Sequence, residues 1–266
     1  MVEGKRSLFI RKGWSNFFTP ALIIFFVMPA AFGQDQSEIE ITFTSPPPGH
    51  PQLELSKLTP EKRDALLKIA DKYTLYMVAA KMLSEGDPEL DEYLFDRLSL
   101  SALMLKELKL GNYNIYEESP NKYHWIDPKG VFGQFHMVYK GPGKRIYYGS
   151  GFYDGKVMPR MDGEAIMIFV YHPVEGQSGR IMENEVYAYI KVDNYFFSTV
   201  TRVLRPLLPA LVRERMNGLF MNSKALSEWI ARDPADVYRR LEGTGRVPRE
   251  ELLEFKAFFL DNERRK

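Results

Sequence analysis

The sequence contains no cysteine among its 266 residues. This absence excludes disulfide-stapled scaffolds, thiolate zinc sites, iron–sulfur clusters and thiol catalysis. An excess of charge of one sign is also absent, because 36 Lys and Arg stand against 35 Asp and Glu, for a net charge of +1. A dedicated nucleic-acid-binding protein usually carries a clear basic excess. We therefore expect no nucleic acid among its partners.

Histidine is scarce, and its placement matches no motif. The chain has four: His50, His124, His136 and His172. No two of them stand at metal-ligand spacing, and HExxH does not occur. The stretch Gly149-Ser150-Gly151 is not a nucleophile elbow, because that motif needs Gly two residues before Ser and position 148 is Tyr. We therefore predict no metal, no cofactor and no catalytic residue.

Aromatic side chains are what the chain has in quantity. They make up 14% of it, from 18 Phe, 15 Tyr and 3 Trp. Hydrophobic residues at 45% and charged residues at 27% are ordinary for a globular protein, which excludes wholesale disorder and a polytopic membrane protein. Beyond the N-terminus the aromatics concentrate between Tyr113 and Phe197. This concentration indicates an aromatic-rich sheet in that region.

The first 33 residues have the pattern of a secretory signal peptide. Four basic residues lie within the first twelve, and no charged residue then appears until Asp35. An apolar segment at 21–28 is followed by small residues at 31 and 33, which suits cleavage before Gln34. We expect an exported protein, periplasmic or extracellular if bacterial. An uncleaved membrane anchor is the alternative, although the apolar core is short for a span of about 20 residues.

Three further regions follow the predicted signal peptide. Residues 34–58 form an extended lead-in with a possible first strand at 39–44, residues 59–232 form the main domain, and residues 233–266 form a helical extension. Apolar periodicity favours helices at 60–85, 88–98 and 100–109, and a long helix that starts near 208 and ends near 232. Alternating segments bounded by turns predict antiparallel strands near 112–118, 122–127, 132–140, 144–153, 163–172 and 180–192.

The junction of the last strand with the long helix is the most distinctive piece. Residues 185–194, EVYAYIKVDN, lead into the helical segment 207–213, LLPALVR. The whole order resembles the START-like helix-grip superfamily, over roughly residues 38–232, on element order and the aromatic sheet alone. The resemblance implies an α+β fold, with a curved antiparallel sheet of six to seven strands gripping a long C-terminal helix. It also implies an apolar ligand between sheet and helix.

The resemblance suggests which residues would contact such a ligand. Residues 164–171 are apolar on both faces of their strand, so we expect both faces to be covered. The apolar candidates on the sheet and the long helix are Phe135, Met137, Tyr147, Met167, Phe169, Tyr187, Tyr189, Val212, Met216 and Phe220. His136 and Arg160 are the candidates for contact with a polar head group. The alternative is that these side chains simply fill a core.

The sequence favours an exported, non-enzymatic binding or carrier protein for an apolar small molecule or lipid. Arginines near the start of the long helix, at positions 202–215, suggest transient contact with an anionic membrane surface. Two alternatives stay open. One is an enzyme of the same fold acting on a hydrophobic substrate, and the other is a structural or partner-binding envelope protein with a filled core.

Overall fold

The computed structural model describes residues 39–86, 88–128, 130–154, 160–176, 179–193 and 207–261. The predicted signal peptide, residues 1–33, lies outside the described residues. Residues Glu38–Lys266 make up one compact unit. None of the helices in the described ranges is both long enough and apolar enough to cross a membrane.

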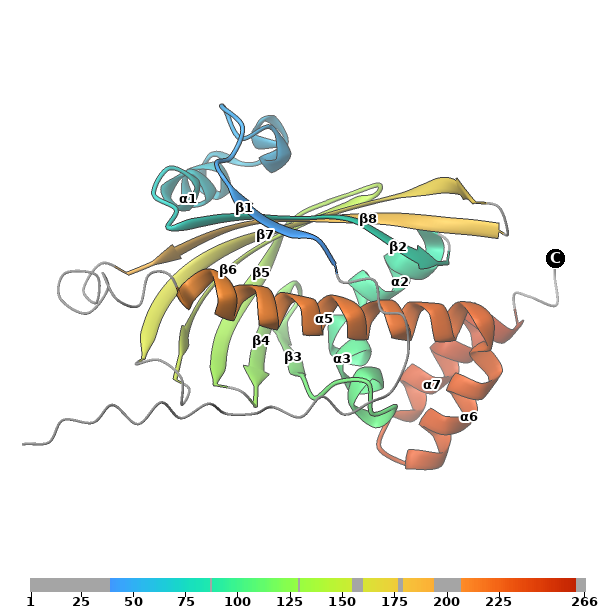
Figure 1. Ribbon diagram of the computed structural model, residues 1–266. Coiled ribbons are helices and arrows are strands. Elements are labelled where there is room, and N and C mark those ends of the chain that lie inside the picture. Colours follow the sequence, from blue (N-terminus) through green and yellow to red (C-terminus); the bar gives the residue numbers. More distant parts are fainter. Residues whose placement is uncertain are drawn as a thin grey trace, which may run out of the picture. The chain divides into compact units, whose positions relative to one another are not determined.

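Eight antiparallel strands form a sheet (Figure 1). In chain order they are β1 (Ile41–Thr44), β2 (Leu75–Glu85), β3 (Asn114–Ser119), β4 (Lys122–Asp127), β5 (Val131–Gly141), β6 (Lys144–Tyr153), β7 (Met161–Gly176) and β8 (Gly179–Val192). Their order across the sheet is β1-β2-β8-β7-β6-β5-β4-β3. The mixed α+β class and the six consecutive antiparallel strands are confirmed, with eight strands in place of the six to seven expected.

Helices precede, interrupt and follow these strands. They are α1 (Pro60–Ala70), α2 (Pro88–Asp96), α3 (Leu98–Glu107), α5 (Leu207–Arg232), α6 (Pro234–Thr244) and α7 (Arg249–Phe255). Short 3-10 turns at Pro51–Leu53 and Leu55–Lys57 precede α1, and a π-helical turn at Lys256–Asp261 follows α7. Proline begins α1, α2 and α6, where its missing N–H leaves no helical hydrogen bond unmade.

The predicted helix over 60–85 was wrong in its second half. The helix ends at Ala70, and Leu75–Glu85 is the additional strand, β2. β2 pairs with β1 on one side and with β8 on the other, and both of its faces are covered. A strand buried on both faces has a continuous apolar sequence, and periodicity alone does not separate it from a buried helix.

Different elements cover the two faces of the sheet, which we call the outer and the inner face. Figure 1 shows α1 on the outer side and α5 on the inner side. The outer face and its cover form a core of Leu53, Leu58, Leu66, Ile69, Ala70, Tyr76, Ile146, Ile166, Ile168 and Tyr189. On the inner face α5 packs against β2 and β8 through Met77, Ala79, Val186, Ala188, Met216 and Phe220.

The C-terminal helices pack into a helical core next to the sheet. This core contains Leu90, Tyr93, Leu100, Met104, Leu105, Leu108, Leu226, Ile230, Val237, Leu241, Val247 and Phe255. It therefore joins α6 and α7 to α2, α3 and α5. Burial here raises the pKa of Tyr93 to about 12, because the phenolate is disfavoured away from water.

Candidate functional site

A cavity of about 430 Å³ lies between the inner face of the sheet and helices α2, α3 and α5. Its volume falls within the range of roughly 300–1,000 Å³ that is typical of small-molecule sites. The cavity is partly open to solvent. It lies beside the region where α5 packs directly on β2 and β8, so the inner face is packed in one part and hollow in another.

The floor of the cavity consists of residues with little or no side chain. Gly151 pairs with Gly133 on one side and with Gly163 on the other. Two residues earlier on the same strand, Gly149 pairs with Ala165. Paired residues, and residues two apart on one strand, point to the same face of a sheet. These five positions therefore form one bare patch, which we call the glycine floor.

Backbone packing explains why these positions hold glycine. A Cβ atom on Gly149 would lie 2.6 Å from the carbonyl oxygen of Gln134. A Cβ atom on Gly163 would lie 2.7 Å from the carbonyl oxygen of Lys191. Glycine inside a strand commonly marks such a close approach of another backbone. The same residues leave open the space that side chains fill elsewhere on the sheet.

Apolar side chains surround the glycine floor. From the sheet these include Phe135, Tyr147, Met167 and Phe169, and from the helices Leu94, Phe95, Leu98, Leu105 and Phe220. The Tyr147 ring meets Phe135 and Phe169 edge-on, at centroid distances of 5.8 and 5.7 Å. Burial raises the pKa of Tyr147, so its phenol stays neutral. Such a lining can bind a ligand by removing apolar surface from water.

Half of the apolar candidates named from the sequence line this cavity. These are Phe135, Tyr147, Met167, Phe169 and Phe220. Val212 and Met216 lie on α5 and pack against the sheet instead, within the inner-face core. Met137 pairs with Tyr147 and so points to the inner face, but it is not among the residues that line the cavity.

The placement of Tyr187 and Tyr189 beside the cavity was wrong. Both lie on the outer face, where they belong to the core under α1. Alternation along β8 puts Val186 and Ala188 on the inner face and sends the two tyrosines to the other side. The ring of Tyr189 is fully buried, and its hydroxyl lies 3.2 Å from Nδ1 of His50.

Neither polar candidate reaches the cavity. His136 stacks on Tyr148 on the outer face of the sheet, at a centroid distance of 6.4 Å. Arg160 is exposed, lies 3.9 Å above the ring of Phe152 and forms an ion pair of 3.3 Å with Asp162. The head-group role predicted for these two residues therefore has no geometric support.

Other polar residues line the cavity, and four of them form one set. Ser84, Asp91, Asn184 and Ser227 come from β2, α2, β8 and α5 and meet at one end of it. Asn184 Nδ2 donates a hydrogen bond of 3.2 Å to Ser84 Oγ. These four residues, which we call the polar end, were not among the candidates named from the sequence. The region of Ser84 was assigned to a helix, and Asn184 and Ser227 are far from it in the chain.

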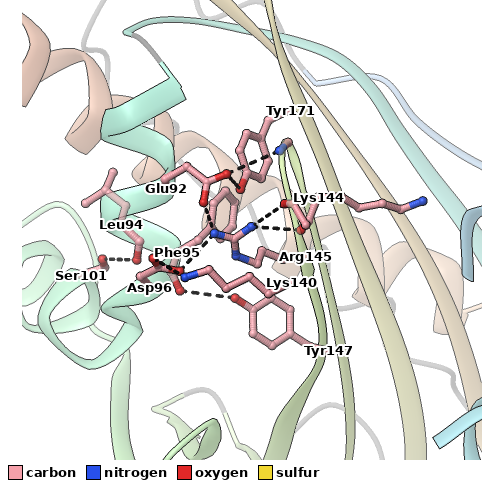
Figure 2. A network of polar contacts seen from close by, with 12 residues as sticks. Glu92, Leu94, Phe95, Asp96, Ser101, Lys140, Lys144, Arg145, Tyr147 and Tyr171 are labelled. Atoms are coloured by element: carbon pink, nitrogen blue, oxygen red, sulfur yellow. Dashed lines mark hydrogen bonds and ion pairs between the residues drawn. The ribbon is translucent and has the colours of Figure 1, made fainter. Parts of the chain in front are cut away.

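An ion-pair network around Arg145 joins α2, which lines part of the cavity, to the sheet (Figure 2). The Arg145 side chain is fully buried and bonds to Glu92 and Asp96, both on α2. Its guanidinium also donates to the carbonyl oxygens of Gly141 and Lys144, at 2.8 and 3.0 Å. One cation thus joins the β5–β6 turn to the helix that carries Leu94 and Phe95 into the cavity wall.

Two further side chains complete this network. The Tyr171 hydroxyl donates to Glu92 Oε1 at 2.7 Å, and Lys140 Nζ donates to Asp96 Oδ2 at 2.7 Å. Burial favours a higher pKa for Asp96, but the hydrogen bonds from Lys140 and Arg145 outweigh it and hold that pKa below its usual value. The arrangement suits a structural clamp, because Arg145 is enclosed by its partners.

Metal-binding clusters and cavity-lining histidines are absent from the described residues. No group of three His, Asp or Glu side chains in them is placed to hold a metal ion. None of the four histidines, all within the described ranges, lines the cavity. The residues that line the cavity can enclose an apolar molecule and form hydrogen bonds with it at one end.

Comparisons with known proteins give no family. No family model matches the chain, and no curated protein is significantly similar to it. Among solved structures, a conserved protein from Geobacillus kaustophilus matches at 12% identity with a TM-score of 0.38, over 56% of this chain and 94% of that one. A protein from Mycobacterium smegmatis matches at 14% identity with a TM-score of 0.32, over 59% and 91%. Matches this distant say nothing about what the chain binds.

Proposed function

We propose that this protein is an exported, non-enzymatic binding or carrier protein for an apolar ligand of the lipid class. The ligand occupies the cavity between the sheet and helices α2, α3 and α5. In this proposal the sheet curves around α5 in the manner of the START-like helix-grip superfamily. Exchange of ligand takes place in transient contact with a membrane surface.

The cavity with its glycine floor is the observation that carries the proposal. Protein interiors are packed as densely as organic crystals, and an apolar void costs stability in proportion to its volume. A space of about 430 Å³ above four glycines and one alanine therefore fits an occupant better than a packing defect. Its mostly apolar lining favours an occupant that is itself mostly apolar.

The cavity also bears on the alternatives. A structural envelope protein with a filled core requires packed side chains between sheet and helices, and the cavity disfavours that interpretation. An enzyme acting on a hydrophobic substrate needs groups for proton transfer at the substrate. No histidine lines the cavity, and the buried carboxylate that does line it, Asp91, is the group that such an enzyme would have to use.

Uptake of an uncharged fluorescent apolar probe tests the proposal. The full-length gene is expressed in a bacterial host, and the intact mass of the product reports whether the leader is removed. Addition of N-phenyl-1-naphthylamine to the purified protein should give saturable fluorescence enhancement. Native mass spectrometry should show a copurified or added lipid.

A matched pair of variants tests whether the probe binds in the cavity. Ala165→Phe adds a ring to the glycine floor and should abolish uptake, whereas Ala235→Phe adds the same ring to an exposed position on α6 and should leave it unchanged. Equal uptake by both variants, with both folded by circular dichroism, would contradict binding in this cavity. No uptake by the parent protein would contradict the proposed function.

A further inference from the structure

The polar end of the cavity differs from polar groups on the protein surface because most of its side chains are buried. Ser84 and Asp91 are each 6% exposed, and Ser227 is 5% exposed. The described residues contain five buried polar or charged side chains in all, so this end of the cavity holds three of them. The fourth member, Asn184, is partly buried and hydrogen-bonded to Ser84. Three buried polar side chains and Asn184 thus lie where the cavity meets β2, β8, α2 and α5.

These groups are placed as a set by four separate elements. Met82 pairs with Asn184 and Ser84 pairs with Met182, so the two polar side chains lie diagonally on the inner face of neighbouring strands. Gly86 ends this part of β2, and a Cβ atom at that position would lie 3.5 Å from Ser227 Oγ. Ser227 of α5 therefore lies next to the segment that joins Ser84 to α2. Asp91 is on α2.

The hydrogen-bonding capacity of this set is rich in acceptors. An ionised Asp is an acceptor only, and each Ser hydroxyl can accept as well as donate. Asp91 lies in the first turn of α2, where the helix N-terminus favours negative charge. Ser227 Oγ has no hydrogen-bond partner among the described residues. A buried polar group without a partner costs free energy, and a bound molecule can remove that cost.

We infer that the ligand is an apolar molecule bearing one hydrogen-bond-donating group, a hydroxyl or an amine, which is recognised by Asp91 and Ser227 at the polar end. This inference rests on the proposed function and names the class of ligand. A fatty acid fits the Asp91 and Ser227 end poorly, because its carboxylate can only accept hydrogen bonds and would lie near the Asp91 carboxylate. Lys224, which also lines the cavity, has Glu228 as its ion-pair partner at 3.7 Å. A hydrocarbon without a hydrogen-bond donor would form no hydrogen bond with Asp91 or Ser227.

Displacement of N-phenyl-1-naphthylamine from the full-length expressed protein at pH 7 tests this selectivity. Four ten-carbon competitors are compared: 1-decanol, decylamine, decyl methyl ether and decanoate. The ether keeps an oxygen acceptor but has no donor. Decanol and decylamine should bind at least about tenfold more tightly than the ether, the size expected for one or two buried hydrogen bonds. Decanoate should be the weakest.

Two variants and one control connect the selectivity to the named residues. Asp91→Asn keeps the shape but replaces one acceptor oxygen by a donor, so the preference for decanol over the ether should fall about tenfold and decanoate should gain. Ser227→Ala should also reduce the preference. Ser56→Ala, on the exposed 3-10 turn before α1 and outside the cavity lining, should leave it unchanged.

The outcomes separate this inference from the proposed function. Equal affinity for decanol and the ether in the parent protein would overturn the inference, while binding in the cavity would stand. Unchanged preference in Asp91→Asn and Ser227→Ala, with both variants folded, would also overturn it. Failure of all four competitors to displace the probe, together with uptake that Ala165→Phe does not affect, would instead overturn the proposed function.

Discussion

The outer and inner faces of one sheet differ in how their space is used. Under α1, the outer face carries Ile146, Ile166 and Ile168, all fully buried in a packed core. On the inner face of the same two strands, β6 and β7, Gly149 and Gly163 contribute no side chain. Because successive residues of a strand point to opposite faces, one segment can build a solid core and a cavity floor together. The inner face is therefore hollow only over the glycine floor, and it is packed elsewhere.

The two faces also differ in what holds their covering helices. α1 covers the outer face through apolar contacts such as Leu66 and Ile69. α2, over the cavity, is held by the ions around Arg145 as well as by apolar packing. Ionic contacts at its edge can fix a helix over a space that offers it few packing partners.

Removal of Arg145 should have the largest effect on stability. Arg145→Ala leaves Glu92 and Asp96 without their buried cation, and we expect a loss of about 4 kcal/mol in the free energy of unfolding. Urea denaturation measures it. The control, Arg239→Ala, removes an exposed ion pair with Asp236 and should cost less than about 1 kcal/mol. Similar losses in the two variants would mean that α2 is held by apolar packing alone.

Neighbouring residues of β7 compare the two faces directly. Ile168→Ala opens a void in the packed outer core and should cost about 3 kcal/mol. Met167→Ala, one residue earlier and only partly buried, should cost less, about 2 kcal/mol. Denaturant titration of both variants gives the difference. If Met167→Ala is the more damaging, the inner face is packed as tightly as the outer one.

Acid should weaken the clamp on α2. The pKa of Asp96 is lower in the folded protein than in the unfolded chain, where it is about 3.9. The stability from this shift is therefore present above the unfolded pKa and is lost as pH falls through the folded pKa. Asp96→Asn should make the dependence of unfolding free energy on pH shallower below about pH 5. Asp64→Asn, on the exposed side of α1, is the matched control and should leave it unchanged.

Loss of one tyrosine hydroxyl on each face should have the smallest effects. Tyr147→Phe removes a long hydrogen bond of 3.4 Å to the carbonyl oxygen of Phe95 and should cost about 0.5 kcal/mol. Tyr189→Phe leaves Nδ1 of His50 without its partner and should cost about 1 kcal/mol. Thermal and urea unfolding of the pair can resolve the order. A larger loss of unfolding free energy for Tyr147→Phe than for Tyr189→Phe would show that the Tyr147 hydroxyl helps to hold α2.

The sheet was largely predictable because its turns are explicit in the sequence. Pro120-Asn121 and Pro142-Gly143 form the turns that join β3 to β4 and β5 to β6. Asn121 and Gly143 adopt positive φ values of 64° and 63°, which these residue types tolerate best. Short turns of this kind require antiparallel neighbours, so the order of the six strands followed.

β2 and the cavity residues were less predictable because they depend on distant partners. Met77 and Ala79 could belong to a helix or to a buried strand, and pairing with β1 and β8 decided between them. Arg145 looks like an exposed strand residue until the two carboxylates some fifty positions earlier are placed beside it. The polar end likewise depends on tertiary contacts, since its four residues come from four elements.

The sequence by itself determined the α+β class, the six consecutive strands and the long helix that follows them. Those features depend on local turns, periodicity and caps, which act between residues close together in the chain. Only the tertiary structure decided which face of β8 meets the cavity, where α2 is held and which polar groups meet at one end. Those features depend on contacts between distant segments, where one residue of register exchanges the two faces of a strand.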